Sequence, residues 1–306
     1  MTLAGVTREL LVRYLDVWTP AALHGGRRVT FAYAWSGPPD DPASTDAHLE
    51  TAEAALRGFA EFQDLLVRRR LAYLVVGPTA AATDRLDAVQ AELGTPANLA
   101  VHAVSGEPDD MLAAAVSAAG AAGAPLLVYA AIAAPPARLH AAGRPTELIT
   151  VTPPGDWLAQ RSALHARGFR LTTGVEFIDA DGENAACLVS FATDRANNLE
   201  AFKNALWAVD EYAGVRYRDP TDPEGHLQDI SLSPHPGPLR RALLDRLTAT
   251  GPQTVTELRH YALTDTIYRS SDVTRVISLL RHSGAVVSDS HGRLSGDTVV
   301  EVAGGG

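Results

Sequence analysis

Apolar segments of strand length alternate with helix-like segments over the first half of the chain, and this alternation is the strongest constraint on its fold. A helix is predicted over residues 6–19, and Pro20 is expected to end it. The predicted strands are residues 27–35, 71–77, 99–106 and 125–133, with helices at residues 46–70, 82–93 and 109–120 between them. Nearly continuous apolar strands separated by helices predict an α/β fold with a parallel sheet covered on both faces.

An antiparallel hairpin is predicted to close this sheet. Residues 169–179 and 184–194 have the pattern of two strands joined by the turn "ADGE". They follow a strand at residues 147–153 and a helix at residues 156–168, and a helix at residues 198–214 comes next. Parallel units that end in an antiparallel hairpin are typical of the Rossmann-like class I methyltransferase sheet, whereas a plain dinucleotide-binding sheet lacks this reversal. We therefore expect a class I methyltransferase-like, mostly parallel sheet.

A second domain is predicted after a segment rich in Pro, Asp and Gly. We expect an α/β domain at residues 1–215, a linker at 216–237 and a C-terminal domain at 238–303. The C-terminal domain has helix candidates at residues 238–251, 254–264 and 270–284, followed by a hairpin-like segment at 285–302. Three short helices and a hairpin predict a winged helix-turn-helix domain.

Composition excludes several classes of protein. The net charge of −10 argues against a chain wrapped in nucleic acid. The only cysteine, Cys187, excludes an internal disulfide and any cysteine-built metal or iron–sulfur site within the chain. Charged residues in the first 18 positions are not typical of a signal peptide or a membrane span, so we expect a cytoplasmic protein without membrane contact.

Three segments point to a family. "LLVRYLDVWTPAAL", "FAYAWSGPP" and above all "CLVSFATDRANNLEAFKNALWAVDEYAG" resemble the three-Cys-motif partner proteins. This resemblance implies a methyltransferase-like domain that uses S-adenosylmethionine (SAM), often with a winged-helix tail. It also implies a partner with a three-cysteine motif, an iron–sulfur protein of the radical type.

The chain departs from the family pattern where the cofactor would bind. The family's first strand ends in aromatic-Ile-Asp-x-Phe-Ala-Gly-Pro-Gly, but here Tyr33 replaces the Asp and Pro39 replaces the last Gly. Gly77 ends the second strand, where a carboxylate would accept hydrogen bonds from the ribose. The fourth strand runs into residues 130–134, which offer no acid in place of the family's Asp-Pro-aromatic-Gly motif.

These losses predict a catalytically degenerate protein that has no catalytic residues and needs no cofactor. It would act by binding a partner protein, a nucleic acid or a small ligand. The remnant of the SAM pocket is predicted at the following residues: Tyr33, Trp35, Ser36, Gly37, Gly77 and Glu107. Tyr33 and Trp35 share one face of their strand, where they are either core aromatics under a helix or a stacking surface for a flat ligand.

Two alternatives remain open. An active SAM-dependent methyltransferase with a divergent pocket would bind SAM through the backbone at residues 36–37 and through Glu107. A ligand-sensing DNA-binding regulator would use the C-terminal domain, where nucleic-acid or partner contacts are predicted at these residues: Arg269, Ser271, Thr274, Arg275 and Arg293. No metal site is expected, although Asp40, Asp41, Asp46 and His48 cluster in the sequence, since Asp46 is better explained as a helix cap.

Overall fold

The structure is a computed structural model that describes residues 2–37, 41–121, 123–133, 135, 146–179, 182, 184–209, 214–290 and 292–303. Among these residues, no helix combines the length and the apolar character needed to span a bilayer.

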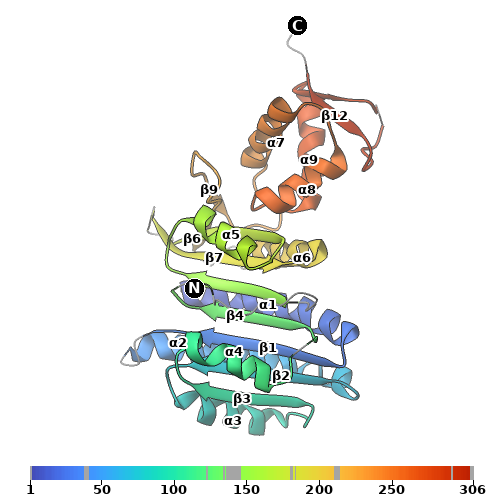
Figure 1. Cartoon of the computed structure of the whole chain (residues 1–306). Helices are drawn as coiled ribbons and strands as arrows, with labels where there is room; N and C mark the ends of the chain where they lie inside the picture. The colour runs from blue at the N-terminus through green and yellow to red at the C-terminus, as the bar shows by residue number, and fades with distance from the viewer. Residues whose placement is uncertain are drawn as a thin grey trace.

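A nine-stranded sheet forms the centre of the larger domain (Figure 1). Its strands are β1 (Arg28–Trp35), β2 (Arg70–Gly77), β3 (Leu99–Ser105), β4 (Leu126–Ala131), β5 (Thr146–Thr152), β6 (Leu171–Asp179), β7 (Ala185–Thr193), β8 (Val215–Arg218) and β9 (Leu227–Asp229). They are ordered β3-β2-β1-β4-β5-β7-β6-β8-β9. Strands β1 to β5 pair in parallel, and β7 runs antiparallel to both of its neighbours, β5 and β6. The large, mostly parallel sheet with this reversal confirms the expected α/β fold and matches a methyltransferase-like fold.

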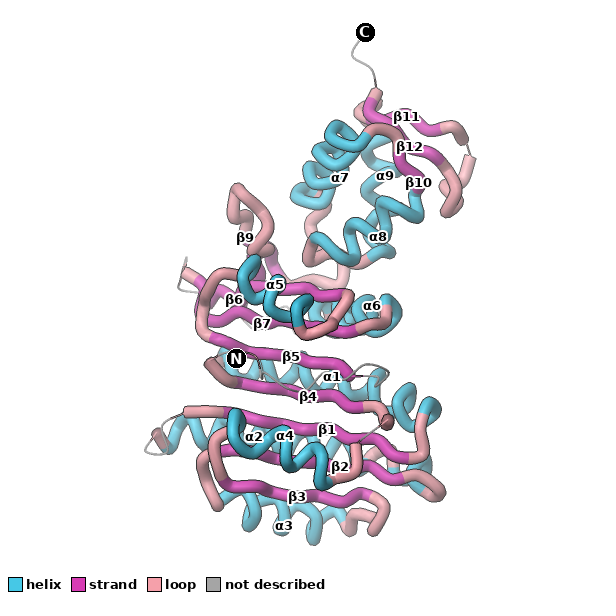
Figure 2. The backbone as a smooth tube through the Cα atoms, in the orientation of Figure 1, coloured by secondary structure: helices cyan, strands magenta, loops and turns pink. Residues whose placement is uncertain are grey.

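Helices cover both faces of the sheet, as expected for strands that are apolar on both sides (Figure 2). One face carries α1 (Leu3–Gly25), α2 (Pro42–Ala60), α3 (Ala81–Leu93) and α6 (Ala196–Trp207), which share one hydrophobic core. The other face carries α4 (Pro108–Ala118) and α5 (Trp157–Ala166), which belong to a second core.

Three predicted helices have wrong boundaries; one of them, predicted over residues 198–214, is α6 and ends at Trp207. Helix α1 continues through Pro20 to Gly25, because Ala22 and Leu23 are buried and their packing outweighs the hydrogen bond that proline removes. The helix predicted over residues 46–70 is instead α2, which begins at Pro42, followed by a short 3-10 helix, η1 (Gln63–Leu66). Its predicted last residue, Arg70, belongs to β2, where it pairs with Arg28.

The predicted linker is partly strand. Residues 215–218 and 227–229 form β8 and β9, which extend the sheet beyond β6 in antiparallel pairing. Tyr217 on β8 is fully buried: its ring lies 4.8 Å from that of Phe177, and its hydroxyl donates to the carbonyl of Leu206 (2.9 Å). The alternation of "VRYR" around this buried aromatic is a half-buried strand pattern, which the flanking Pro and Asp residues obscured.

The buried residues of the C-terminal helices belong to the same hydrophobic cluster as those of α1, α2, α3 and α6. Helices α7 (Gly237–Thr250), α8 (Val255–Asp265) and α9 (Ser270–His282) pack through buried residues such as Leu243, Leu258 and Ile277. Strands β10 (Gln253–Thr254), β12 (Val299–Val302) and β11 (Val286–Ser288) form an antiparallel sheet in that order. Thr254 and Glu257 form a capping box that starts α8 directly after β10.

Candidate functional site

The carboxyl ends of β1 and β2 are covered by an aromatic side chain. Trp35, the last residue of β1, is 1% exposed, and its indole lies against Gly77, the last residue of β2. A Cβ atom added to Gly77 would lie 2.3 Å from Cζ2 of Trp35, far too close for any real side chain. The indole therefore fills the space in which a carboxylate at the end of β2 would reach a ribose.

Tyr33, His48 and Tyr129 complete this aromatic cluster. The rings of Trp35 and His48 are stacked with centroids 5.6 Å apart, and those of Tyr33 and Tyr129 are stacked at 5.4 Å. The Tyr33 hydroxyl lies 2.8 Å from Nδ1 of His48. Burial lowers the pKa of His48 to about 4, so the imidazole is neutral near neutral pH. Tyr33 and Trp35 are thus core aromatics beneath α2, and their role in cofactor binding stays a prediction.

The other residues predicted for the remnant pocket do not converge on a ligand. The backbone N–H of Ser36 donates to the carbonyl of Ala131 (3.0 Å), which extends the pairing of β1 with β4. A side chain at Gly37 would meet nothing within 4 Å. Glu107 is exposed at the N-terminus of α4, and its side chain makes no capping hydrogen bond. Residues 38–40 of this loop lie outside the described residues.

The acidic cluster before and within α2 has structural roles. Asp41 caps the N-terminus of α2, so the prediction that Asp46 is the cap was wrong; one turn into the helix, Asp46 pairs with Arg85 instead (3.0 Å). His48 packs on Trp35, and Asp40 lies outside the described residues. In the part of the chain that the structure describes, no group of three His, Cys, Asp or Glu residues could hold a metal ion.

A fully buried lysine joins the two domains. Nζ of Lys203, on α6, lies 2.6–3.2 Å from the carbonyl oxygens of Ala262, Leu263, Thr266 and Tyr268. These oxygens belong to the end of α8 and the turn before α9, where a helix leaves its carbonyls without partners. Burial lowers the pKa of this ammonium to about 7, against the raising effect of nearby carboxylates, of which Asp219 has the largest effect. Lys203 therefore caps α8 from the neighbouring domain.

Two further contacts of α6 fix the same turn. The indole N–H of Trp207 donates to the carbonyl of Ile267 (3.1 Å), and the Glu200 carboxylate accepts from the backbone N–H of Ser270 (3.0 Å). Glu200, Lys203 and Trp207 all lie in the segment that carries the most specific family resemblance. In this chain the segment works as the attachment point of the C-terminal domain.

Most of the contact residues predicted in the C-terminal domain have partners within the chain. Arg269 and Arg275 donate to backbone carbonyls in residues 231–236 (2.9 and 2.7 Å), and Arg269 also pairs with Asp272. Thr274 accepts a hydrogen bond from an arginine of α8. Ser271 and Arg293 are exposed. Whether any of these residues contacts a nucleic acid or a partner stays a prediction.

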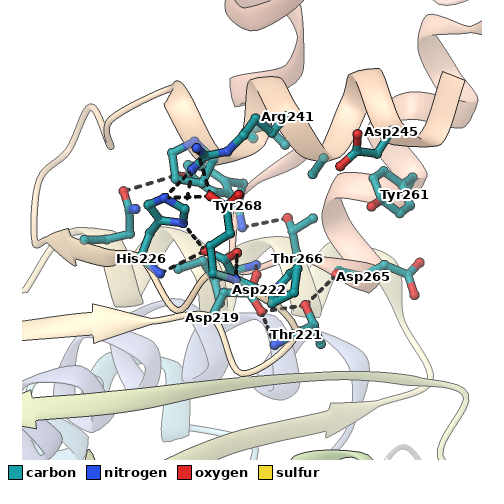
Figure 3. Close-up of a pocket in the computed structure, with 17 residues that line it drawn as sticks. Asp219, Thr221, Asp222, His226, Arg241, Asp245, Tyr261, Asp265, Thr266 and Tyr268 are labelled. Atoms are coloured by element: carbon teal, nitrogen blue, oxygen red, sulfur yellow. Dashed lines mark hydrogen bonds and ion pairs between the residues drawn. The ribbon is translucent and has the colours of Figure 1, made fainter. Parts of the chain in front are cut away.

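A cavity of about 180 Å³ lies at the domain junction, between the β8–β9 segment and helices α7 and α8 (Figure 3). Five carboxylates line it: Asp219, Asp222, Glu224, Asp245 and Asp265. Figure 3 shows His226 and Arg241 grouped with Asp222 on one side, and Asp245, Tyr261 and Asp265 on the other. Sequence reasoning missed this cavity because residues 216–237 looked like a linker. The acidic residues between the prolines of this segment were the sequence signal that could have indicated the cavity.

Four of the five carboxylates already have partners. Asp222 lies 2.7 Å from His226, Glu224 lies 3.1 Å from Arg241, and Asp265 pairs with Arg161 at 2.9 Å. Asp219 accepts from the backbone N–H of Ile267 (2.9 Å), and burial raises its pKa. Asp245 has neither an ion pair nor a hydrogen bond to any described residue, and it is exposed.

A second buried polar group lies near the amino end of β5, the central strand of the sheet. Glu147, at the start of β5, is 5% exposed and lines a cavity of about 100 Å³. Its carboxylate accepts hydrogen bonds from the Tyr14 hydroxyl and from the Asn198 amide (2.5 Å). Burial raises the pKa of Glu147 to about 7, against the lowering effect of these donors. The network ties α1 and α6 to β5.

No protein-family model matches the sequence, and no curated protein matches it either. Among solved structures, the chain is similar to a predicted O-methyltransferase from Agrobacterium tumefaciens, with 14% sequence identity and a TM-score of 0.29. The match covers 59% of this chain and 79% of that one. The strand order and the reversal of β7 define the methyltransferase-like fold of the sheet.

Proposed function

We propose that this chain is a catalytically degenerate methyltransferase-fold protein that acts by binding. The observation that carries the proposal is the Trp35 indole packed against Gly77 at the carboxyl edge of the sheet. An adenosyl cofactor needs exposed backbone and a carboxylate at this edge. Here the aromatic cluster takes the space at the ends of β1 and β2, and the N–H of Ser36 is committed to Ala131.

Calorimetric titration of the full chain with SAM tests the proposal. We expect no saturable heat, because SAM would have to displace a core tryptophan that is 1% exposed. Saturable binding in the micromolar range would contradict the proposal and favour an active methyltransferase with a divergent pocket. In that case, replacing Gly37 by Trp should abolish the binding, since the space beside Gly37 is open.

The resemblance to the three-Cys-motif partner proteins supports a specific partner class, an iron–sulfur protein of the radical type with three cysteines. We propose that the C-terminal domain is a winged helix-turn-helix in which α8 and α9 form the helix pair and β11 and β12 form the wing. Because the first turn of α9 is bonded to Glu200 on α6, this domain is better suited to a protein surface than to the major groove of DNA.

Size-exclusion chromatography under anaerobic conditions tests the partner. The chain is mixed with a three-cysteine radical-type protein, and we expect the two to co-elute as a complex. Separate elution at micromolar concentration of both proteins would count against this partner class, and it would leave the SAM result unaffected.

A further inference from the structure

Five arginines gather at the amino ends of β1 and β2, away from the carboxyl ends where SAM would bind. The two strands are neighbours in the sheet (Figure 1), and Arg28 and Arg70 are paired directly in register. The backbone N–H of Arg70 also donates to the carbonyl of Arg27 (2.9 Å). All but one of the five side chains are exposed. We call this set the arginine patch, and its members are Arg27, Arg28, Arg68, Arg69 and Arg70.

The arginine patch has no counter-charge among the described residues. None of the five guanidinium groups forms an ion pair or a side-chain hydrogen bond with any of them. Glu61 and Asp64, the nearest acids in the sequence, are exposed and do not pair with it. Other arginines of this domain differ, because Arg8, Arg57 and Arg85 each lie 2.5–3.0 Å from a carboxylate. The patch is therefore unbalanced positive charge on a chain whose net charge is −10.

Arg28 and Arg70 bring like charges side by side. Neighbouring strands lie about 4.8 Å apart, and like charges at paired positions repel each other. Both side chains point to the α4 face of the sheet, since Val29 and Leu71 belong to the core on the other face. Near them is the end of α4, where a Cβ at Gly120 would lie 3.7 Å from Nη1 of Arg28. A bound anion between the two guanidinium groups would remove their repulsion.

The segment before β2 holds the patch in place and adds an apolar group. Leu66 is 1% exposed, and its carbonyl accepts from the N–H of Arg69 (3.1 Å) and from the Asn98 amide (2.9 Å). Val67, directly before the arginines, is 74% exposed, more than any other large hydrophobic side chain in the described part of the chain. A surface that is already fixed loses little conformational entropy when it binds.

Charge and apolar contact together favour a protein segment as the occupant. Carboxylates pair with guanidinium groups in the bidentate geometry that suits arginine. A nucleic acid offers no apolar side chain to Val67, and its charge continues past the patch, where the acidic remainder of the chain repels it. An anionic bilayer is likewise a continuous negative surface, and one valine buries too little apolar area to anchor a protein on it.

We propose that the arginine patch and Val67 form a docking surface for an acidic segment of a partner protein. Carboxylates of the segment pair with Arg28 and Arg70, and an apolar side chain of the segment packs on Val67. This surface lies on the sheet domain and away from the carboxyl ends of its strands. Its test therefore depends neither on the SAM titration nor on the radical-type partner.

Fluorescence anisotropy of a labelled peptide, Glu-Asp-Leu-Glu-Asp-Leu-Glu-Asp, tests the surface in the full chain. We expect saturable binding in the micromolar range that weakens as salt is added, because exposed ion pairs are screened. The same peptide with both leucines replaced by glycine should bind more weakly, since it offers nothing to Val67. Equal binding of the two peptides, or no saturation below millimolar concentration, would overturn the proposal.

Variants test the named contacts. Arg28→Gln combined with Arg70→Gln should weaken peptide binding about tenfold, because charge-assisted contacts are lost. Urea denaturation should show no loss of stability in this double variant, since a repulsive pair is removed. Val67→Ser should weaken only the leucine peptide. The matched control is Arg57→Gln combined with Arg240→Gln, which changes the net charge equally at exposed positions outside the patch and should leave the affinity unchanged. An equal loss in the control would mean non-specific attraction and would overturn the site.

Two further probes test the other anionic partners. One is a single-stranded oligonucleotide with as many charges as the peptide, and the other is a vesicle of phosphatidylcholine and phosphatidylserine. We expect both to bind more weakly than the leucine peptide. Tighter binding of either probe that is lost in the Arg28 and Arg70 double variant would assign the surface to nucleic acid or to a membrane, and it would overturn the assignment to an acidic protein segment.

Discussion

At the scale of single residues, the packing around Gly77 explains why this position has no side chain. The indole of Trp35 lies where a Cβ would be, so the two residues form a matched pair. A carboxylate side chain at position 77 is excluded by this packing, because the aromatic ring already fills the space it would need.

Gly77→Ala should destabilise the fold by about 1–3 kcal/mol, because the new methyl group overlaps a buried ring. Urea denaturation measures this. The matched control is Gly37→Ala, where a Cβ meets nothing within 4 Å and the change should stay within about 0.5 kcal/mol. The double variant Gly77→Ala with Trp35→Leu should lose less stability than the sum of the two single changes. Equal effects at positions 77 and 37 would contradict the packing assigned to Trp35.

Glu147 should make stability depend on pH. Its pKa in the folded state is raised from 4.5 to about 7, mainly by burial, so the native state binds the proton more tightly than the unfolded chain. The protonated Glu147 side chain therefore adds to the free energy of unfolding. This stabilisation is complete below about pH 4.5 and is lost as pH rises to about 7. The loss amounts to up to about 3 kcal/mol.

Urea denaturation of Glu147→Gln and of the wild type across this pH range measures the effect. In the variant, the free energy of unfolding should show little of the decrease that the wild type shows as pH rises. Glu92→Gln is the control, since Arg57 holds the pKa of that exposed carboxyl below its usual range and its removal should not abolish the decrease. If the free energy of unfolding fell equally with pH in Glu147→Gln and in the wild type, the role of Glu147 would be contradicted.

At the scale of elements, α6 serves two structures at once. One side packs on the sheet through Leu199, Phe202 and Leu206, and Lys203 reaches the carbonyls at the end of α8. A helix C-terminus usually finds its partners in a glycine turn or in water. Here a side chain of another domain supplies them, so the fold of the C-terminal domain is coupled to that of the sheet domain.

Lys203→Met should destabilise the junction by about 3 kcal/mol, because buried carbonyl oxygens lose their only charged donor. Limited proteolysis should then cut residues 216–237 faster than in the wild type. Asn204→Met changes the neighbouring exposed residue of α6 and should leave the rate unchanged. Identical cleavage of the two variants would show that Lys203 does not hold the domains together.

At the scale of the whole molecule, both the net charge and the contact between α9 and α6 disfavour binding to nucleic acid. The chain carries a net charge of −10, and the first turn of α9 is bonded to α6 through Glu200. Binding of duplex DNA depends mainly on neutralising phosphates with exposed cations. Of the two arginines predicted near the start of α9, Arg269 and Arg275, both donate to carbonyls of the chain itself.

We expect no retardation of duplex DNA by the full chain at about 0.15 M salt. Gel-shift titration over a range of salt concentrations checks this. Retardation that falls steeply with salt and is lost in Arg293→Ala, on the exposed loop between β11 and β12, would instead support the DNA-binding regulator.

The sequence by itself determined the class of the fold. Apolar strands alternating with helices predict a covered parallel sheet, and the hairpin pattern of residues 169–194 predicts the antiparallel pairing of β6 with β7. It also singled out Tyr33 and Gly77 near the ends of two predicted strands. Local patterns suffice for such features because each depends on residues close together in the chain.

Only the tertiary structure decided what those residues do. That Trp35 covers Gly77, that Lys203 caps a helix more than 50 residues away, and that Gln228 and Asp245 face one cavity all depend on contacts between distant segments. The burial of Tyr217, which turns part of the linker into β8, is of the same kind. No periodicity in the sequence encodes such contacts, because they arise when separate elements bury their apolar faces against each other.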